Sequence, residues 1–203
     1  MTAAAALASK SARAVWVAWA LAAVLAACAP QGAGSQSAGP GDGPGGPFHL
    51  VNQDGRDVDQ RVLDGKWSLV FFGYTFCPDV CPTTLTTLGQ AMKDLGPKAS
   101  QAQVVFITVD PARDTPKAMK AYLSSPAFPR NAIGLTGTPA EIAQVAKAYV
   151  VYYRKDGDGP NYAMDHSTAI YLMNPSGRFD RVIADGLTPA QDAQQISQAI
   201  ASS

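Results

Sequence analysis

The chain has 203 residues, of which 47% are hydrophobic and 16% are charged, so it is long enough and apolar enough to bury a core. Its 16 basic and 16 acidic residues balance, which argues against a nucleic-acid-binding protein and against recognition of acidic substrates by bulk charge. Much of the glycine and proline gathers between residues 33 and 47, and this separates the first part of the chain from the rest.

The N-terminal segment is typical of an export signal. Lys10 and Arg13 precede an almost wholly apolar run, Ala14–Ala27, which is shorter than the roughly 20 residues that a membrane-spanning helix needs. The run ends in a Leu-Ala-Ala-Cys sequence that closes at Cys28 and resembles the bacterial lipobox, whose cysteine is lipidated and becomes the first residue of the mature protein. We therefore expect residues 1–27 to be a lipoprotein signal peptide. An uncleaved anchor helix with an incidental cysteine is the alternative.

The next segment, residues 28–47, is rich in glycine, proline and serine and shows no apolar periodicity. Such a composition cannot bury a core, so we expect a lipid-anchored flexible linker that leads to a folded domain at 48–203. Several acyl chains on Cys28 would hold the protein firmly at a membrane. This organisation predicts an exported, membrane-anchored lipoprotein whose domain faces the periplasm or another extracytoplasmic space.

Beyond the linker, strand and helix patterns alternate. Trp67–Gly73 and Val104–Val109 are apolar runs rich in β-branched and aromatic residues, which is typical of buried strands. Pro82 and Pro139 suit the first turns of two helices. The alternation, followed by an antiparallel hairpin, predicts an α/β protein: a thioredoxin-like mixed sheet flanked by helices, with an N-terminal β-hairpin extension. The expected strands are 48–51, 58–62, 67–73, 104–109, 133–136, 149–154, 168–173 and 178–184, and the expected helices are 82–95, 115–123, 138–148 and 187–200.

Two cysteines stand between the first of these buried strands and the helix that follows it. With Cys28 assigned to the lipid anchor, Cys77 and Cys81 form an isolated pair. A structural disulfide across so small a loop would remove little chain entropy, and redox or metal chemistry is therefore favoured. Because the pair precedes a helix N-terminus, we expect the partial positive charge there to favour the thiolate form.

A third soft-metal ligand is available from histidine. Two thiolates and one imidazole would make a trigonal site that suits Cu(I). The chain has two histidines: His49 lies in the first expected strand, and His166 lies in a loop before the expected strand 168–173. In a thioredoxin-like topology that loop lies beside the helix after the cysteines, so His166 is the histidine that could reach both sulfurs. Asp79 and Asp165 either orient the ligands or form turns, and both interpretations remain open.

Three segments carry a resemblance to a known family. Phe72–Pro82, which contains both cysteines, is similar to the signature of the Sco/SenC family. Val109–Pro116 resembles the second motif of that family, and Asp165–Thr168 resembles the third. The order and spacing of the motifs cover roughly residues 48–200. The N-terminus differs: many members of the family look as though they carry a membrane-spanning helix where this chain has the lipobox-like sequence. In the second motif, we expect the charged residues to form a local ion pair that shapes a loop near the site.

The resemblance implies a membrane-tethered metallochaperone rather than an enzyme, with thiol-disulfide reductase activity left open. One copper ion per domain, as Cu(I), Cu(II) or both, would be held by Cys77, Cys81 and His166. The protein would assist assembly of the binuclear copper centre of cytochrome c oxidase by delivering copper, by reducing the target cysteines, or by both. The implied partners are the copper-bearing subunit of the oxidase and other periplasmic copper chaperones or thiol reductants.

Two alternatives use the same cysteines. A thiol-disulfide oxidoreductase of the thioredoxin class, without an obligate metal, usually has two residues between its cysteines and a cis-proline before the strand that here starts at Thr168. This chain has three intervening residues and no proline between Tyr162 and Thr168, which counts against a general dithiol enzyme. A peroxide-reducing enzyme with Cys77 as the peroxidatic thiol would share the broad fold, and no feature of the sequence favours it.

Overall fold

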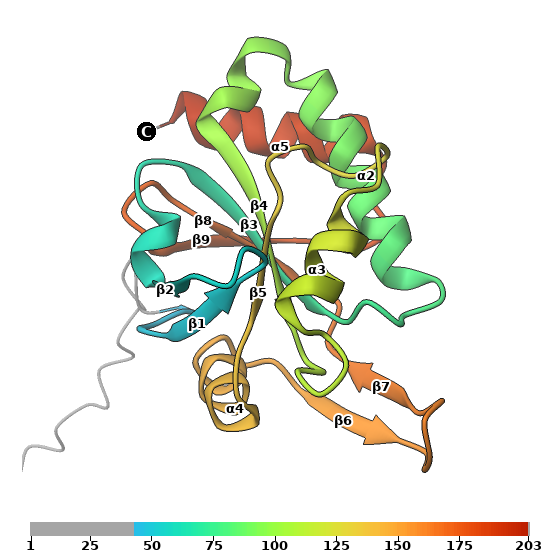
Figure 1. Cartoon of the computed structure of the whole chain (residues 1–203). Helices are drawn as coiled ribbons and strands as arrows, with labels where there is room; N and C mark the ends of the chain where they lie inside the picture. The colour runs from blue at the N-terminus through green and yellow to red at the C-terminus, as the bar shows by residue number, and fades with distance from the viewer. Residues whose placement is uncertain (1–42, 203) are drawn as a thin grey trace, which may run out of the picture. The chain divides into compact units, whose positions relative to one another are not determined.

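A seven-stranded sheet organises the part of the chain that the computed structural model describes, residues 43–202 (Figure 1). The predicted signal peptide, Cys28 and most of the predicted linker lie outside the described residues. The strands are β1 (His49–Asn52), β2 (Asp57–Asp59), β3 (Trp67–Gly73), β4 (Ala102–Thr108), β5 (Ile133–Thr136), β6 (Tyr153–Asp156), β7 (Ala163–His166), β8 (Ile170–Met173) and β9 (Phe179–Ile183). The α-helices are α2 (Val80–Asp94), α3 (Pro116–Leu123), α4 (Pro139–Ala148) and α5 (Pro189–Ala201), and the 3-10 helices are η1 (Gln60–Leu63) and η2 (Gly96–Gln101).

The sheet is mixed, with the order β2-β1-β5-β4-β3-β8-β9. Strands β3, β4 and β5 run parallel to their neighbours in that group, and the remaining pairs are antiparallel. Every residue of β3 and β4 is buried, as expected for parallel strands that are covered on both faces. The predicted mixed sheet flanked by helices is therefore confirmed.

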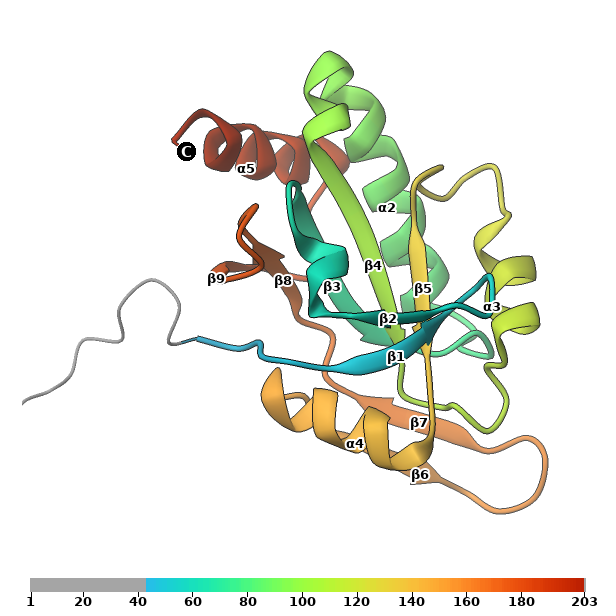
Figure 2. The same ribbon diagram turned by 60° about the vertical axis from the view of Figure 1, so that its left-hand side comes forward.

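The two faces of the sheet are covered by different helices. Phe71 and Phe106 are register partners on one face, and the ring of Tyr122, from α3, packs against Phe106 at 5.9 Å. Phe72 points to the other face, where the ring of Tyr149, directly after α4, lies 5.4 Å away. Figures 1 and 2 accordingly show α2, α3 and α5 on one side of the sheet and α4 on the other.

A small second sheet lies apart from the main one. Strands β6 and β7 pair only with each other among the described strands, and the hairpin extends away from the main sheet at the lower right of Figure 1. The predicted strand 149–154 begins too early, because Val150 adopts a left-handed conformation with φ of 56° after the end of α4. Strand β7 was not predicted, since its alternating, half-exposed residues give no apolar run.

The N-terminal hairpin is shorter than predicted. Only Asp57–Asp59 pairs with β1, and the expected continuation to Val62 is wrong. The side chain of Asp59 accepts a hydrogen bond from the backbone N–H of Arg61 at 2.9 Å and caps the 3-10 helix that replaces the strand. This local hydrogen bond stabilises a turn where the apolar alternation indicated a strand.

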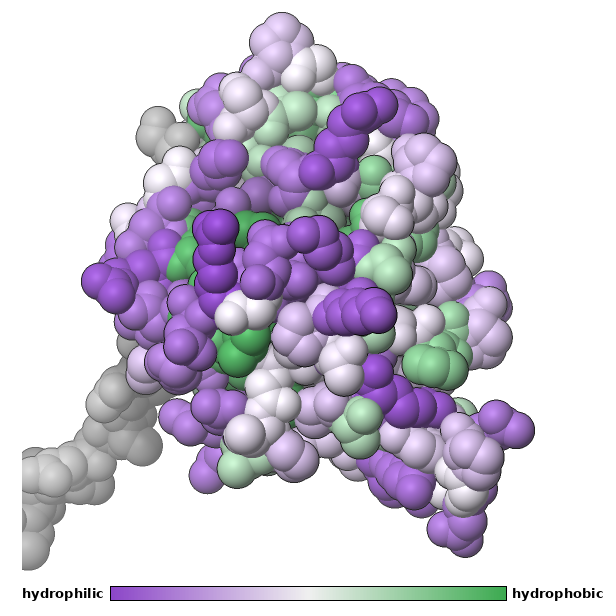
Figure 3. Space-filling model, viewed as in Figure 1, coloured by the Kyte–Doolittle hydropathy of each residue, from purple (hydrophilic) through white to green (hydrophobic). Residues whose placement is uncertain are grey.

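Polar residues cover most of the face seen in Figure 3, with apolar patches between them. Within residues 43–202, the large hydrophobic side chains that remain exposed are Phe76, Val80, Val150, Tyr152 and Val182. Phe76 directly precedes Cys77 and Val80 directly precedes Cys81, so apolar surface lies next to the expected metal ligands. No helix of the described region is long and apolar enough to cross a membrane.

Candidate metal centre

The loop between β3 and α2 positions the two cysteines. The backbone N–H of Cys77 donates to the carbonyl of Tyr74 at 3.2 Å, which turns the chain after β3. Helix α2 begins at Val80, two residues before the predicted start, so Cys81 lies in its first turn rather than in the loop. The backbone N–H of Cys81 then donates to the sulfur of Cys77 at 3.4 Å, which holds the two side chains together.

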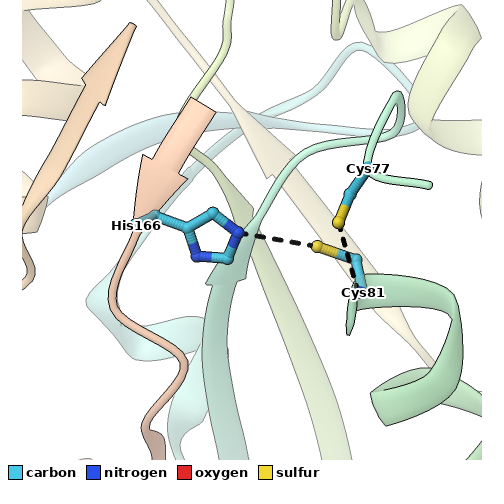
Figure 4. A group of neighbouring side chains, drawn as sticks. All are labelled: Cys77, Cys81 and His166. Carbon is cyan, nitrogen blue, oxygen red and sulfur yellow. Dashed lines mark hydrogen bonds between the residues drawn. The ribbon is translucent and has the colours of Figure 1, made fainter. Parts of the chain in front are cut away.

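Two sulfurs and one imidazole converge at this place (Figure 4). The Sγ atoms of Cys77 and Cys81 and a ring nitrogen of His166 all lie within 4.8 Å of one another. The distance from Cys81 Sγ to His166 Nε2 is 3.8 Å. Within the described residues, this is the one group of three or more histidine, cysteine or acidic side chains that could hold a metal ion. The expected meeting of His166 with the cysteine pair is present, although the residue ends strand β7 instead of lying in a loop.

The donor set fits a soft metal ion. Bonds of about 2.0 to 2.3 Å to nitrogen and sulfur, as zinc forms with these ligands, place the three donors of a trigonal site roughly 3.5 to 4 Å apart. The 3.8 Å between Cys81 Sγ and His166 Nε2 is in that range. Thiolate and imidazole ligands together suit Cu(I) and zinc better than hard cations such as magnesium.

The two sulfurs differ in their access to solvent. Both cysteines are free thiols, but Cys77 is half-buried and Cys81 is fully buried. Burial raises the pKa of the Cys81 thiol well above its usual range, and the neighbouring Cys77 acts in the same direction. In the metal-free chain this burial opposes the expected effect of the helix N-terminus, because loss of solvation disfavours the charged thiolate of Cys81. A metal that binds here must displace the Cys81 proton.

A glycine at the end of β3 makes room for the buried sulfur. A Cβ atom built on Gly73 would lie 2.6 Å from the Sγ of Cys81 and 2.7 Å from the ring of Phe106. Real Cβ atoms do not approach other heavy atoms so closely, so any larger residue would force the sulfur or the ring to move. Gly73 was not predicted as a site residue, although a glycine that closes an otherwise bulky strand is a usable signal.

The imidazole of His166 is oriented by its own backbone neighbour. Its Nδ1 atom lies 2.9 Å from the carbonyl oxygen of Ser167, so Nδ1 carries the proton and donates it. This tautomer leaves the lone pair of Nε2 directed at Cys81. Tyr74 contacts the same ring edge-on, with 5.9 Å between centroids. The other histidine, His49, is exposed and lies near Glu141 on a different part of the domain.

Comparison with known proteins identifies the family. The family model described as SCO1/SenC matches residues 37–201. The chain belongs to the SCO1/SenC family. The mitochondrial SCO1 homolog 1 of Arabidopsis thaliana is 43% identical over 137 residues, which are 66% of this chain and 40% of that protein. The mitochondrial SCO2 homolog of Homo sapiens is 41% identical over 160 residues, which are 76% of this chain and 58% of that protein. The chain thus spans about half the length of these curated relatives.

Solved Sco structures share the fold. Bradyrhizobium japonicum ScoI with copper bound is 44% identical, with a TM-score of 0.70 over 76% of this chain and 98% of that one. Yeast Sco1 with copper bound is 37% identical, with a TM-score of 0.72 over 79% of this chain and 90% of that one. BsSco, described with a disulfide switch and as a member of the Sco family of cytochrome c oxidase assembly proteins, is 26% identical, with a TM-score of 0.62 over 77% and 92%. These similarities confirm the predicted thioredoxin-like fold.

The two aspartates named from the sequence have other partners. Asp79 precedes α2 and lies 3.5 Å from the hydroxyl of Thr83, with no side-chain hydrogen bond that caps the helix. Asp165 pairs with Arg154 at 2.8 Å on the exposed side of the hairpin. Within the described residues these carboxylates bond Thr83 and Arg154 and not the donor atoms of the site, so a role in orienting the ligands stays a prediction.

Proposed function

We propose that this Sco-family chain binds one copper ion through Cys77, Cys81 and His166 and assists assembly of the binuclear copper centre of cytochrome c oxidase. The observation that carries the proposal is the convergence of two sulfurs and one imidazole nitrogen within 4.8 Å. Support comes from relatives whose structures contain bound copper and from one described as an oxidase assembly protein. In this role copper is cargo, supplied as Cu(I) or Cu(II) and passed to a target.

The unequal burial of the sulfurs supports a transfer step. Cys81 is enclosed by protein, whereas Cys77 is half-buried and lies beside the exposed Phe76. An incoming thiolate of the target can therefore replace Cys77 as a ligand before Cys81 lets go. Cys81 and His166 hold the ion during this exchange, and the ion leaves when the target supplies its remaining ligands.

Reduction of the target is the second candidate, and the exposure of Cys77 favours it as well. The Cys77 thiolate would attack one sulfur of a target disulfide and form a mixed disulfide, releasing the other target sulfur as a thiolate. Cys81 would then attack Cys77 and release the second target thiol. Two electrons pass to the target, and the chain is left with a Cys77–Cys81 disulfide. A thiol-disulfide oxidoreductase of the thioredoxin class would use the same steps without an obligate metal.

We further propose the organisation predicted from the sequence. Residues 1–27 are a lipoprotein signal peptide, 28–47 a linker anchored through lipidated Cys28, and 48–203 the Sco domain. This places the site outside the cytoplasm, held at a membrane, where the copper-bearing subunit of the oxidase and other copper chaperones or thiol reductants can reach it. Incorporation of labelled fatty acid into the wild-type chain, and its loss in Cys28→Ala, would test the anchor. An unlabelled wild-type chain would contradict it.

Copper binding is tested on the full-length chain, purified in mild detergent and loaded anaerobically with Cu(I). We expect one copper ion per chain, with strongly weakened binding in Cys77→Ser, Cys81→Ser and His166→Ala. His49→Ala is the matched control, because it removes the other imidazole of the chain from an exposed position. A wild-type chain that binds no copper would contradict the proposal. Full affinity in His166→Ala would remove histidine from the site.

Copper delivery and thiol reduction are distinguished by the redox state of the target cysteines. The copper-bearing domain of the oxidase is prepared once with its cysteines reduced and once with them as a disulfide. Copper delivery predicts metal transfer to the reduced target from the copper-loaded chain. Thiol reduction predicts that the metal-free chain converts the oxidised target to its dithiol form, with loss of free thiols from Cys77 and Cys81.

A further inference from the structure

The hairpin that carries His166 has little of its own to hold it in place. Strands β6 and β7 form a separate two-stranded sheet, and none of their residues is fully buried. An isolated two-stranded hairpin is marginally stable in water. The imidazole must nevertheless stay 3.8 Å from the sulfur of Cys81, which belongs to the protected centre of the fold. Tyr153 and Met164 pack against the core from one side of the hairpin, and a polar contact from outside the hairpin adds to them.

Arg113 provides this contact from the loop after β4. Its Nη1 atom donates to the backbone carbonyl of Tyr162 at 2.9 Å, directly before β7, and its guanidinium lies 3.6 Å from the centre of the Tyr162 ring. Its Nε atom pairs with the carboxylate of Asp110. The hydroxyl of Tyr162 donates to the same carboxylate at 2.7 Å. Tyr162 is therefore held by its backbone, its ring and its hydroxyl at once.

The same guanidinium also contacts the cysteine segment. It lies 4.8 Å from the ring centre of Phe76, the residue before Cys77, and 5.6 Å from that of Tyr74. Tyr74 in turn contacts the His166 ring edge-on. One side chain thus touches the aromatic residues that flank both halves of the metal centre.

The loop that bears Arg113 is itself fixed to the main sheet. Asp114 is fully buried and accepts hydrogen bonds from the Thr108 hydroxyl at the end of β4 and from the backbone and hydroxyl of Thr75. The backbone N–H of Asp110 donates to Thr108 at 2.8 Å. Asp114 therefore anchors the cysteine loop to β4, and Arg113 extends this anchor to the hairpin.

The burial of the pair indicates a role in geometry. The side chains of Arg113 and Asp110 are only 13% and 4% exposed. In the described residues the Nη2 atom of Arg113 is buried without a hydrogen-bond partner, so its charge is balanced by one carboxylate and by aromatic faces. A buried ion pair contributes little net stability, because desolvation offsets its attraction, but it can specify one arrangement.

We infer that Arg113 is a positioning residue that holds the β6–β7 hairpin against the cysteine loop and so keeps His166 at the metal centre. The inference rests on the proposed copper site for its consequence, but the contact itself exists without metal. Loss of the guanidinium leaves Cys77 and Cys81 in place and frees the hairpin that carries the third ligand. Lysine does not substitute, because its compact ammonium lacks the planar guanidinium that stacks on Tyr162 while two separate nitrogens bond Asp110 and the Tyr162 carbonyl.

The experiment compares Arg113→Met and Arg113→Lys with the wild-type full-length chain. Arg154→Met is the matched control, because Arg154 pairs with Asp165 in the same hairpin but is 61% exposed. Amide hydrogen exchange of the metal-free chains is measured first. We expect exchange in β6 and β7 to rise about tenfold or more in both Arg113 variants, with β3 and β4 unchanged. Arg154→Met should stay close to wild type.

Copper binding by the same chains gives the second readout. We expect the affinity of both Arg113 variants to fall about 10- to 100-fold, as for other residues that orient metal ligands. The absorption bands of their Cu(II) complexes should approach those of His166→Ala. A folded Arg113 variant whose hairpin exchange or copper affinity equals that of the wild type would overturn the inference. Arg113→Lys keeps the positive charge, so it remains informative if Arg113→Met does not fold. A wild-type chain without copper binding would instead contradict the proposed function, and hairpin exchange would still decide the role of Arg113.

Discussion

At the residue scale, the two sulfurs of the site are set by very different neighbours. Cys77 lies at the surface end of a turn, with the exposed Phe76 beside it. Cys81 lies in the first turn of α2, where Gly73 leaves space for its buried sulfur. Metal binding by Cys81 therefore depends on loss of its proton and on the space left by Gly73. Metal binding by Cys77 depends on its access from solvent.

Substitution of Gly73 should displace the Cys81 sulfur directly. In Gly73→Ala the new methyl group would meet the Cys81 sulfur and the Phe106 ring, so we expect a loss of about 1 to 3 kcal/mol in the free energy of unfolding from overpacking. Copper affinity should fall as well, because the sulfur must move. Gly96→Ala is the control: its left-handed φ of 56° costs about 1 kcal/mol, but no atom lies within 4 Å of the new methyl group. Equal copper affinity in Gly73→Ala and Gly96→Ala would contradict the expectation.

At the element scale, α5 combines a strong helix start with an unfavourably placed acid. Thr188 and Gln191 form a capping box around Pro189, which defines where the helix begins. Asp192 follows in the first turn, where the helix dipole favours negative charge. However, its side chain is 2% exposed and its Oδ1 atom has no hydrogen-bond partner in the described residues. Burial, with a smaller contribution from Asp185, raises the pKa of Asp192 to about 6.

This raised pKa makes stability depend on pH. Below about pH 4 the carboxyl is protonated in both the folded and unfolded chain; between about pH 4 and 6 only the folded chain keeps the proton, so stability falls as pH rises through this window. Asp192→Asn removes the penalty. We expect it to raise the free energy of unfolding at pH 7 by on the order of 1 to 2 kcal/mol, with little change at pH 4.

Urea denaturation of the two chains at both pH values measures this difference. Asp185→Asn is the control, since Asp185 is exposed and its neutralisation should change stability by less than about 0.5 kcal/mol. A difference between wild type and Asp192→Asn that is the same at pH 4 and pH 7 would show that the carboxyl does not titrate in this window.

The elements that the sequence predicts well are the continuously buried strands. Strands β3 and β4 are buried at every position, and their apolar runs gave their positions closely. Strand β7 was missed because its stability depends on Arg113 and Tyr162, which lie 49 residues apart, and local periodicity cannot report such a contact. The second half of the N-terminal hairpin was mispredicted for a similar reason: hydrogen bonds from the backbone and guanidinium of Arg61 to Asp59 override the strand pattern.

At the scale of the whole molecule, the candidate site joins the main sheet and its helices to the β6–β7 hairpin. Cys81 and His166 are 85 residues apart in sequence and come from α2 and from the hairpin. The three ligand residues could be named from the sequence, because two sulfurs stand at a strand-to-helix turn and the family motifs point to His166. How they meet could not be predicted: Gly73 and Arg113 lie within the first two motifs, but their packing and stacking contacts depend on the folded chain.

A metal ion that ties the two parts together should stabilise the whole domain. Copper at about 100 times its dissociation constant should add about 2.7 kcal/mol to the free energy of unfolding, if the unfolded chain binds it weakly. For a domain of this size, that corresponds to a rise of about 5 to 10 °C in the melting temperature. Anaerobic calorimetry with and without Cu(I) measures the rise. Cys77→Ser should lose it, and an equal rise in that variant would indicate binding elsewhere.

The separation of the ligands along the chain also has a consequence for how the protein is made. Cys77 and Cys81 are four positions apart, whereas the loop that brings His166 to them is about twenty times longer. Short loops close before long ones, so a newly made chain presents two neighbouring thiols before the imidazole has arrived. During that interval the pair is a bare dithiol, open to any oxidant and unable to hold a metal in its final geometry. Maturation of such a chain therefore depends on the thiols staying reduced until the last hairpin has docked.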